Sequence, residues 1–365
     1  MKSIFSSWPY VSGELHLGRL IGSFIPADCY RRLLSLNLIE ATHYSGLDCY
    51  GEKSIINLDK KIKEVHELHL SIFKRLDIAL TYGSTANDLF KTQCIDNLKS
   101  LKLNNSIILK NISYPYCNRC ATEKRLKRAS NCDICNNRLV EKEEERLIIY
   151  PLNKKDNSSR RYEEIERPSL TPGLQSPFNR DKKIWVWIQA LHGYEHISKG
   201  GEGGIYFYGK DNEYFHKNLL PALYPKRTGT TMHYVSNYLL VGDKKMSGSK
   251  NNYLTISLFE GEEDFLRLFL LSYNLKNGDK NFSNDSYINF KSWIIKKVIP
   301  VLDGNIDYNS ADCKITSNKL LEEFQKNKSF SCLIRRLQES IGRRTFKTEA
   351  NCIIKILCPR LYDRN

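Results

Sequence analysis

Two short motifs, far apart in the chain, carry residue types that bind and activate a nucleoside triphosphate. In His16-Leu17-Gly18-Arg19, the glycine lets the backbone approach a phosphate, and His16 can donate to charge that develops on it. In residues 244–250, Lys-Lys-Met-Ser-Gly-Ser-Lys, the lysines can close over a triphosphate. Alone, the first could be an incidental loop histidine and the second an exposed basic turn. Together they predict one ATP site, assembled from two halves of a sheet, that activates a carboxylate.

The pattern of apolar residues indicates the elements that position these motifs. A strand is expected at residues 2–7, and apolar residues then recur at helical spacing up to Leu34, with Pro26 expected to kink or divide the helix. A second strand is expected at 39–45, so the order strand, helix, strand indicates a βαβ unit and a parallel sheet. Further strands are expected at 184–188, 205–208 and 234–241, and a helical pattern begins near 258.

Composition places the chain among ordinary globular proteins. The formal net charge of +15 favours a polyanionic partner, although a lysine-rich solvated surface would give the same value. No apolar run approaches the length of a membrane helix, and the N-terminus has no secretory signal pattern, so a cytoplasmic location is expected. The eleven cysteines are therefore expected to be reduced thiols rather than a disulfide framework.

Four of these cysteines have the spacing of a metal site. Cys117 and Cys120 form one C-x-x-C pair, and Cys132 and Cys135 form a second pair, with eleven residues between the two pairs. Four thiolates make a closed tetrahedral site, so they predict a structural Zn²⁺ without a catalytic role; the alternative is four unrelated thiols. The basic residues between the pairs either contact RNA or form a solvated rim: Lys124, Arg125, Lys127 and Arg128.

Aromatic residues crowd several loops expected at the carboxyl ends of the strands, where ligands of open α/β sheets bind. These are Trp8, Tyr10, Trp187, Tyr194 and Phe215. With the carboxylate of Asp48 they would suit an apolar amino acid, although aromatic core packing is the alternative. Residues 204–211 nearly match a phosphate-binding P-loop, but they lack its Ser/Thr and are strand formers. Residues 192–196 match the H-x-x-E-H pattern of metallopeptidases. Gly193, however, weakens the helix that would hold both histidines on one face.

Four segments carry a resemblance to a known family. Residues 8–19 resemble a PY-x-NG-x-x-HxGH segment, residues 46–51 a GTDEYG or ADDAHG segment, residues 186–194 VWxDAPxGY, and residues 208–216 IGKD…FH. On these residues the chain resembles class I aminoacyl-tRNA synthetases, most closely the methionyl-tRNA synthetases, over about residues 1–290.

The resemblance implies an α/β fold, in which a class I Rossmann-like parallel sheet is split by a zinc-knuckle insertion and followed by a small C-terminal α-helical region. The implied divisions are a first catalytic half at 1–110, a connective insertion with the knuckle at 111–165, a second catalytic half with the KMSGS loop at 166–257, a stem-contact-like linker at 258–290, and a reduced α-helical tRNA-binding region at 291–365.

The resemblance also implies the role of each site residue. His16, Arg19 and Lys245 would be catalytic. ATP would be bound by His16, Gly18, Gly209, Asp211, Lys244, Lys245 and Ser247. Asp48 would hold the amino group, and the side-chain pocket would be lined by Trp8, Tyr10, Trp187, Ala190, Leu191, Tyr194 and His216. The expected substrates are methionine, ATP with Mg²⁺, and the initiator and elongator methionine tRNAs.

Several residues depart from the family pattern. Arg19 replaces the second His of the first motif, Gly248 the second Lys of KMSKS, Gln189 an Asp and Leu191 a Pro. These changes keep two alternatives open: a catalytically weakened or inactive tRNA-binding protein, or a class I ligase for another amino acid. The C-terminal arginines either bind the tRNA backbone or form a solvated helix face: Arg335, Arg336, Arg343 and Arg344.

Overall fold

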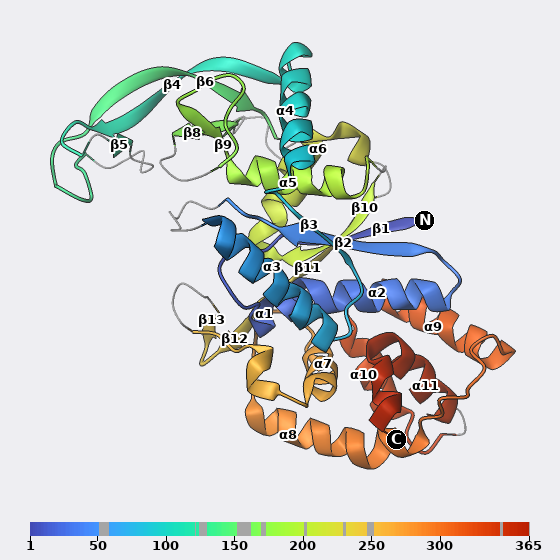
Figure 1. Cartoon of the computed structure of the whole chain (residues 1–365). Helices are drawn as coiled ribbons and strands as arrows, with labels where there is room; N and C mark the ends of the chain where they lie inside the picture. Colours follow the sequence, from blue (N-terminus) through green and yellow to red (C-terminus); the bar gives the residue numbers. More distant parts are fainter. Residues whose placement is uncertain are drawn as a thin grey trace.

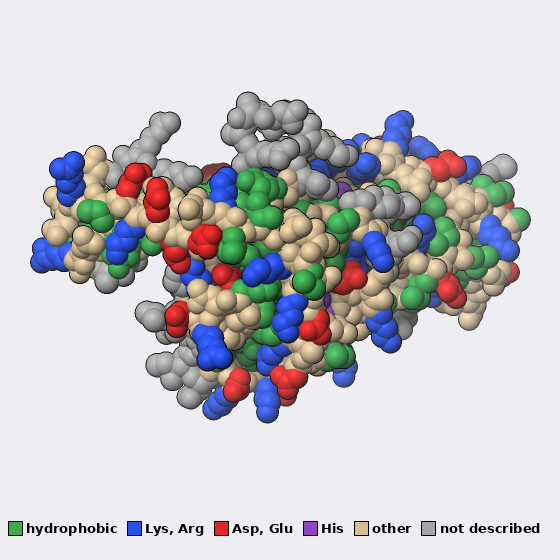
Figure 2. Space-filling model, turned by 90° about the horizontal axis from the view of Figure 1, so that it is seen from above, with side chains coloured by type: hydrophobic (Ala, Val, Ile, Leu, Met, Phe, Trp, Pro, Cys, Tyr) green, Lys and Arg blue, Asp and Glu red, His purple; other side chains and the backbone are tan. Residues whose placement is uncertain are grey.

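The computed structural model describes residues 1–50, 58–120, 122–123, 130–151, 162–168, 173–200, 203–228, 231–246, 252–343 and 346–364. Ser247, the basic residues at 124–128 and Arg344 lie outside these ranges. No helix in the described ranges is both long and apolar enough to cross a bilayer. On the face shown in Figure 2, basic and acidic side chains are interspersed.

A five-stranded parallel sheet forms the centre of the molecule (Figure 1). Its strand order is β11-β10-β1-β2-β3, with bounds Thr231–Ser236, Gly204–Gly209, Lys2–Ser6, Ala41–Leu47 and Thr81–Ser84. The chain leaves β1 in one direction to reach β2 and returns on its other side through β10. The carboxyl end of β1 is therefore a topological switch point, where such sheets bind ligands.

Strand β10 shows why this sheet is buried on both faces. Ile205 and Phe207 belong to the core cluster that includes helix α2, Ile25–Leu36, whereas Tyr206 and Tyr208 belong to the cluster that includes α5, Val186–Ile197. Successive side chains of a strand point to opposite faces, and a sheet covered by helices on both faces is apolar throughout. Residues 204–209 are thus a core strand rather than a flexible phosphate cradle.

The helix after β1 is divided, as Pro26 predicts. A short α1, Leu17–Arg19, leads into a π-helical turn, Leu20–Phe24, and then into α2, which carries Pro26 in its first turn. Proline lacks an N–H and is tolerated at this position.

The predicted strand at 184–188 is wrong beyond Ile184. Strand β9 spans Lys182–Ile184, pairs with β8, Glu166–Pro168, outside the main sheet, and is followed by α5. Residues 186–188 form the first turn of that helix. A short apolar run cannot be assigned to strand or buried helix by periodicity alone, which explains the error.

A long antiparallel hairpin projects from the body (Figure 1). It consists of β4, Ile107–Cys117, and β6, Val140–Ile149, flanked by β5, Thr122–Glu123, and β7, Glu163–Glu164. The guanidinium of Arg146, almost completely buried, forms ion pairs with carboxylates on three of these strands: Glu123, Glu144 and Glu164. These pairs tie the hairpin to its flanking strands.

The remaining helices surround the sheet and form the C-terminal part. Helices α3, α4 and α6 span Leu58–Arg75, Asp88–Leu103 and Leu220–Leu223. After the small sheet of β12, Leu239–Val241, β13, Lys244–Lys245, and β14, Lys280–Asn281, the chain ends in helices. These are α7, Glu263–Ser272; α8, Asn284–Trp293; α9, Ala311–Asn327; α10, Ser331–Glu339; and α11, Phe346–Leu357.

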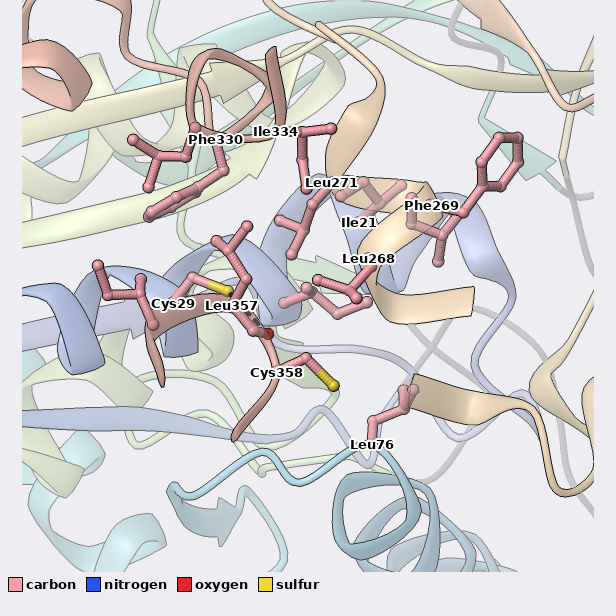
Figure 3. Close-up of a cluster of buried hydrophobic side chains, with 14 of the residues drawn as sticks. Ile21, Cys29, Leu76, Leu268, Phe269, Leu271, Phe330, Ile334, Leu357 and Cys358 are labelled. Atoms are coloured by element: carbon pink, nitrogen blue, oxygen red, sulfur yellow. Dashed lines mark hydrogen bonds between the residues drawn. The ribbon is translucent and has the colours of Figure 1, made fainter. Parts of the chain in front are cut away.

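The C-terminal helices pack directly on α2, in the N-terminal part of the chain. Figure 3 shows Leu357 and Cys358 beside Cys29 of α2 and Leu268 of α7, within one continuous core. Arg336 bridges Glu323 of α9 and Glu349 of α11 at 3.1 and 3.0 Å, which favours a packing role for this arginine over a tRNA contact.

Candidate functional site

A cleft of about 810 Å³ opens at the carboxyl ends of the central strands. Residues from both halves of the chain line it, and eight of the predicted site residues are among them: Tyr10, His16, Gly18, Arg19, Trp187, Gly209, Asp211 and Lys245. The structure therefore brings the first motif and the described part of the second, Lys245 and Met246, together in one crevice.

The fold fixes the proton position on His16. This residue is the N-cap of α1, and its Nδ1 accepts a hydrogen bond from the Arg19 N–H at 3.1 Å. The ring proton therefore lies on Nε2. Burial, reinforced by the cations Arg19 and Lys245, lowers the pKa of His16 to about 3. A neutral imidazole whose Nε2 carries the proton can donate a hydrogen bond at neutral pH.

A tight hairpin presents Lys245 to the cleft. Gly242 and Asp243 have φ of 55° and 60°, as a two-residue type I′ turn between β12 and β13 requires. The Nζ of Lys245 donates to Asp211 Oδ2 at 2.8 Å and lies 4.1 Å from the centre of the Tyr238 ring. Partial burial opposes its charge, but the bond to Asp211 raises the pKa of Lys245. Lys244 shares the hairpin but is not among the lining residues.

Asp48 lies just behind the cleft, at the end of β2. Its backbone bridges to the first loop, since Asp48 N–H donates to Pro9 and Val11 N–H donates to Asp48. The residue is 2% exposed, and burial raises the pKa of its carboxyl to about 8, against the opposing effects of the Tyr50 N–H and Arg19. Burial lowers the pKa of Arg19, which lines the cleft.

The predicted side-chain pocket residues fall into two groups. Trp187 lines the cleft and stacks on Phe215, with ring centres 3.7 Å apart. Trp8, Ala190, Leu191, Tyr194 and His216 are instead buried and are not among the lining residues.

The hydrogen bonds of His216 fix its tautomer. Its Nδ1 donates to the Asn212 carbonyl at 2.8 Å, so the Tyr194 hydroxyl donates to its Nε2, also at 2.8 Å. Burial lowers the pKa of His216 to about 3, so the pair stays neutral.

Two glycines in the segments that carry the resemblance shape this region, although sequence reasoning assigned them no packing role. A Cβ on Gly46 would lie 2.4 Å from the Trp8 ring, and a Cβ on Gly193 would lie 2.5 Å from it. Both positions therefore require glycine while Trp8 fills the space between β2 and α5. Tyr238, which lines the cleft beside Lys245, was also missed, because no motif marks it.

The metallopeptidase-like sequence at residues 192–196 does not form a metal site in the structure. His192 Nδ1 pairs with the Tyr224 hydroxyl, and His196 Nδ1 lies 2.6 Å from the Gln93 side-chain oxygen. Each histidine thus has a protein partner on a different element.

The four predicted zinc ligands converge at the end of the hairpin. The sulfur atoms of Cys117, Cys120, Cys132 and Cys135 all lie within 4.8 Å of one another. With Zn–S bonds of 2.3 Å, a tetrahedral site has S···S distances of about 3.8 Å; Cys117–Cys135 and Cys120–Cys132 are 3.5 and 3.9 Å apart. The N–H groups of Cys120 and Ile134 also point at ligand sulfurs. The donor set therefore fits a structural Zn²⁺.

Loss of one ligand should release the metal. For Cys132→Ser we expect zinc content to fall from about one atom per chain to near zero, because a four-thiolate site has no spare ligand. Metal analysis of the purified protein measures this. Cys94→Ser, which changes a buried cysteine of α4 outside the cluster, serves as the control and should retain its zinc. Full zinc content in Cys132→Ser would contradict the assignment.

A family model described as "tRNA synthetases class I (M)" matches residues 2–147 and 164–293. The chain belongs to the class I tRNA synthetase family. The matched residues contain both signature motifs and the zinc ligands and reach into the C-terminal part, so the family covers the whole cleft of this synthetase chain.

Individual relatives point to one branch of the family. The methionine–tRNA ligase of Pyrobaculum islandicum is 28% identical over 77% of the chain and 65% of its own length. That of Aeropyrum pernix is 26% identical over 60% of the chain and 53% of its own length. The synthetase chain thus matches about half to two thirds of these relatives. Among solved structures, Mycobacterium tuberculosis methionyl-tRNA synthetase in complex with methionyl-adenylate superposes with a TM-score of 0.72 at 14% identity, over 100% of this chain and 93% of the other, and supports the fold.

Proposed function

We propose that this chain is a methionine–tRNA ligase, which forms methionyl-adenylate from methionine and ATP and then transfers the methionyl group to tRNA. One observation carries the proposal: His16 and Lys245, which are far apart in the sequence, line the same cleft. The names of the relatives support methionine as substrate, and the adenylate bound to the M. tuberculosis enzyme supports the intermediate.

In the first step, a methionine carboxylate oxygen forms a bond to the α-phosphorus of ATP, and the bond to pyrophosphate breaks. The Nε2–H of His16 donates to the phosphate oxygens as charge develops there. Lys245 leaves Asp211 and compensates the charge of the leaving pyrophosphate. Arg19 adds a permanent positive charge where the family has a second histidine. Bound Mg²⁺ would shield the phosphate charges.

Asp48 and the aromatic residues hold the amino acid in this scheme. The Asp48 carboxylate receives the ammonium group, and Trp187 with the buried residues behind it receives the apolar side chain. Gly209 and Asp211 contact the ribose, with Gly18 and the 244–247 segment on the phosphates. Holding the reacting groups in place supplies much of the rate enhancement.

In the second step, a terminal ribose hydroxyl of tRNA attacks the carbonyl carbon of the adenylate, and AMP leaves.

We assign residues 1–110 and 166–257 to the catalytic halves, 111–165 to the knuckle insertion, 258–290 to the stem contact and 291–365 to tRNA binding. Initiator and elongator methionine tRNAs are the proposed partners, in the cytoplasm. The positive net charge of +15 supports a nucleic-acid partner.

Methionine-dependent ATP–pyrophosphate exchange tests the proposal directly. Exchange with methionine and not with other amino acids supports it. Exchange with a different amino acid identifies a ligase of altered specificity. Absence of exchange with all twenty amino acids, together with tRNA binding, identifies the non-catalytic tRNA-binding alternative suggested by Arg19 and Gly248.

Asp48 should make methionine binding depend on pH. Its pKa of about 8 means that the carboxyl is neutral below pH 8, whereas holding an ammonium group requires the ionised form. KM for methionine should therefore rise about tenfold for each pH unit below 8. His16 titrates near 3 and Lys245 above its ordinary 10.5, so neither changes charge between pH 6 and 9.

The control for this pH effect is Asp48→Asn. That variant should bind methionine weakly and show no such dependence across the same range. A KM that is constant from pH 6 to 8 in the unmodified protein would refute the role.

A further inference from the structure

A buried histidine outside both signature motifs reaches the loop that carries the first of them. His69 lies on α3 and is fully buried. Its Nε2 is 2.8 Å from the Gly13 carbonyl, and its Nδ1 is 2.7 Å from the Tyr82 hydroxyl of β3. A carbonyl can only accept, so Nε2 carries the proton, and the Tyr82 hydroxyl donates to Nδ1. Both ring nitrogens are thus committed.

The loop that His69 holds forms one wall of the cleft. Ser12, Glu14, Leu15 and His16 all line it, and Gly13 has φ of 108°, a backbone conformation that favours glycine. This loop joins the end of β1 to α1, so its path sets where His16 enters the cleft. His69 holds the carbonyl of Gly13, three residues before His16.

The other side of the loop is held by the segment that follows the second motif. The Leu17 N–H donates to Leu254 at 2.7 Å, His16 forms an isolated bridge with Thr255, and Ser257 donates to Glu14 at 2.8 Å. The loop is therefore clamped between α3 and residues 254–257. Loss of the α3 clamp removes the only side-chain hydrogen bond that the described residues make to the Gly13 carbonyl, so residues 12–16 would be held less firmly on that side.

We propose that His69 is a positioning residue for adenylate formation, acting through the Gly13 carbonyl to place His16 against the phosphates. The inference rests on the proposed function, because the ligand that His16 meets there is ATP. Burial lowers the pKa of His69 to about 4, which keeps the ring neutral and its two hydrogen bonds constant at neutral pH.

Two substitutions separate the two bonds of His69. The amide nitrogen of Gln reaches the place of Nε2 and can still donate to Gly13, whereas the shorter Asn side chain reaches only the place of Nδ1. We expect His69→Asn to lower kcat of ATP–pyrophosphate exchange at least tenfold, because small displacements of catalytic groups are costly. KM for ATP and methionine should change little, and His69→Gln should restore kcat to within about threefold of the unmodified protein.

Tyr82→Phe is the matched control for stability. It removes a hydrogen bond from the same buried cluster without touching Gly13, so it should lower Tm while kcat stays near that of the unmodified protein. If kcat falls in parallel with Tm across all three variants, His69 is only structural and the inference is overturned. Equal kcat in His69→Asn and His69→Gln overturns it as well.

Amide hydrogen exchange at residues 12–16, measured without substrate, tests whether His69 holds the loop. This measurement does not depend on the proposed function. Faster exchange in His69→Asn than in His69→Gln supports the clamp even if the unmodified protein forms no adenylate. Unchanged exchange in His69→Asn overturns it, whatever the activity.

Discussion

Replacing Lys245 with Met should lower kcat of ATP–pyrophosphate exchange by about 100- to 1000-fold, the usual cost of removing one charge-stabilising group from a transition state. The KMSKS motif of the resembled family carries two lysines, and Gly248 occupies the second position here. Lys245 therefore lacks the usual second lysine of the motif. KM for methionine should stay nearly constant, because the charge acts on the leaving pyrophosphate rather than on the amino acid.

Lys347→Met is the matched control for this experiment. Lys347 pairs with Asp303 at 3.0 Å, as Lys245 pairs with Asp211, but it lies in the C-terminal helices away from the cleft. Its loss should leave exchange unchanged. A Lys245→Met variant with more than a third of the unmodified kcat would show that another group supplies the charge, and Arg19 would then be the first residue to test.

The sequence predicts part of the central sheet. It indicates strands near β1, β2 and β10 but not β3, and the expected strand at 234–241 spans the end of β11, a break and β12. Strand β10 is a short run of apolar and aromatic residues between glycines, and Pro26 marks the division of the first helix. The signal for the zinc ligands is local, since two C-x-x-C pairs suffice. The misassigned segment at 186–188 fails for the opposite reason: its apolar residues suit a strand, and only burial within α5 decides.

Site residues are predictable where a motif marks them and not where packing creates them. His16, Asp211 and Lys245 stand in motifs, and the structure brings them to one cleft. His69 stands in an ordinary amphipathic helix, and nothing in its neighbours along the chain indicates that it reaches Gly13 across 56 residues. Gly46 and Gly193 matter only because the Trp8 ring fills the space beside both. Such contacts arise from the tertiary fold.

The same distinction applies to a buried ion pair between α2 and α7. Asp28 of α2 and Arg267 of α7 are both essentially inaccessible and lie 2.6 Å apart. Arg267 also donates to the backbone carbonyls of Leu76 and Leu357, and Asp28 accepts from Arg31 and Arg32. One buried pair thus connects α2, α7, the end of α3 and α11. Neither residue belongs to a motif.

Breaking this pair should be the most destabilising single change that we predict. Asp28→Asn leaves the Arg267 guanidinium buried without its countercharge, and the free energy of unfolding should fall by about 3–5 kcal/mol. Urea unfolding measures the loss. The matched control is Asp77→Asn, because Asp77 pairs with Arg32 at 3.0 Å but is 35% exposed, and such partly solvated pairs contribute about 1 kcal/mol or less.

The contribution of Asp28 to the free energy of unfolding should depend on pH. Burial alone would raise the pKa of the Asp28 carboxyl, but the three surrounding arginines hold this pKa well below its ordinary 3.8. The unfolded chain therefore binds the proton first, so the stabilisation is complete above pH 3.8 and is lost as the pH falls further. Asp28→Asn should flatten this acid limb of the stability curve. An unchanged acid limb, or a loss no greater than that of Asp77→Asn, would mean that hydrophobic packing rather than this pair holds the C-terminal helices on α2.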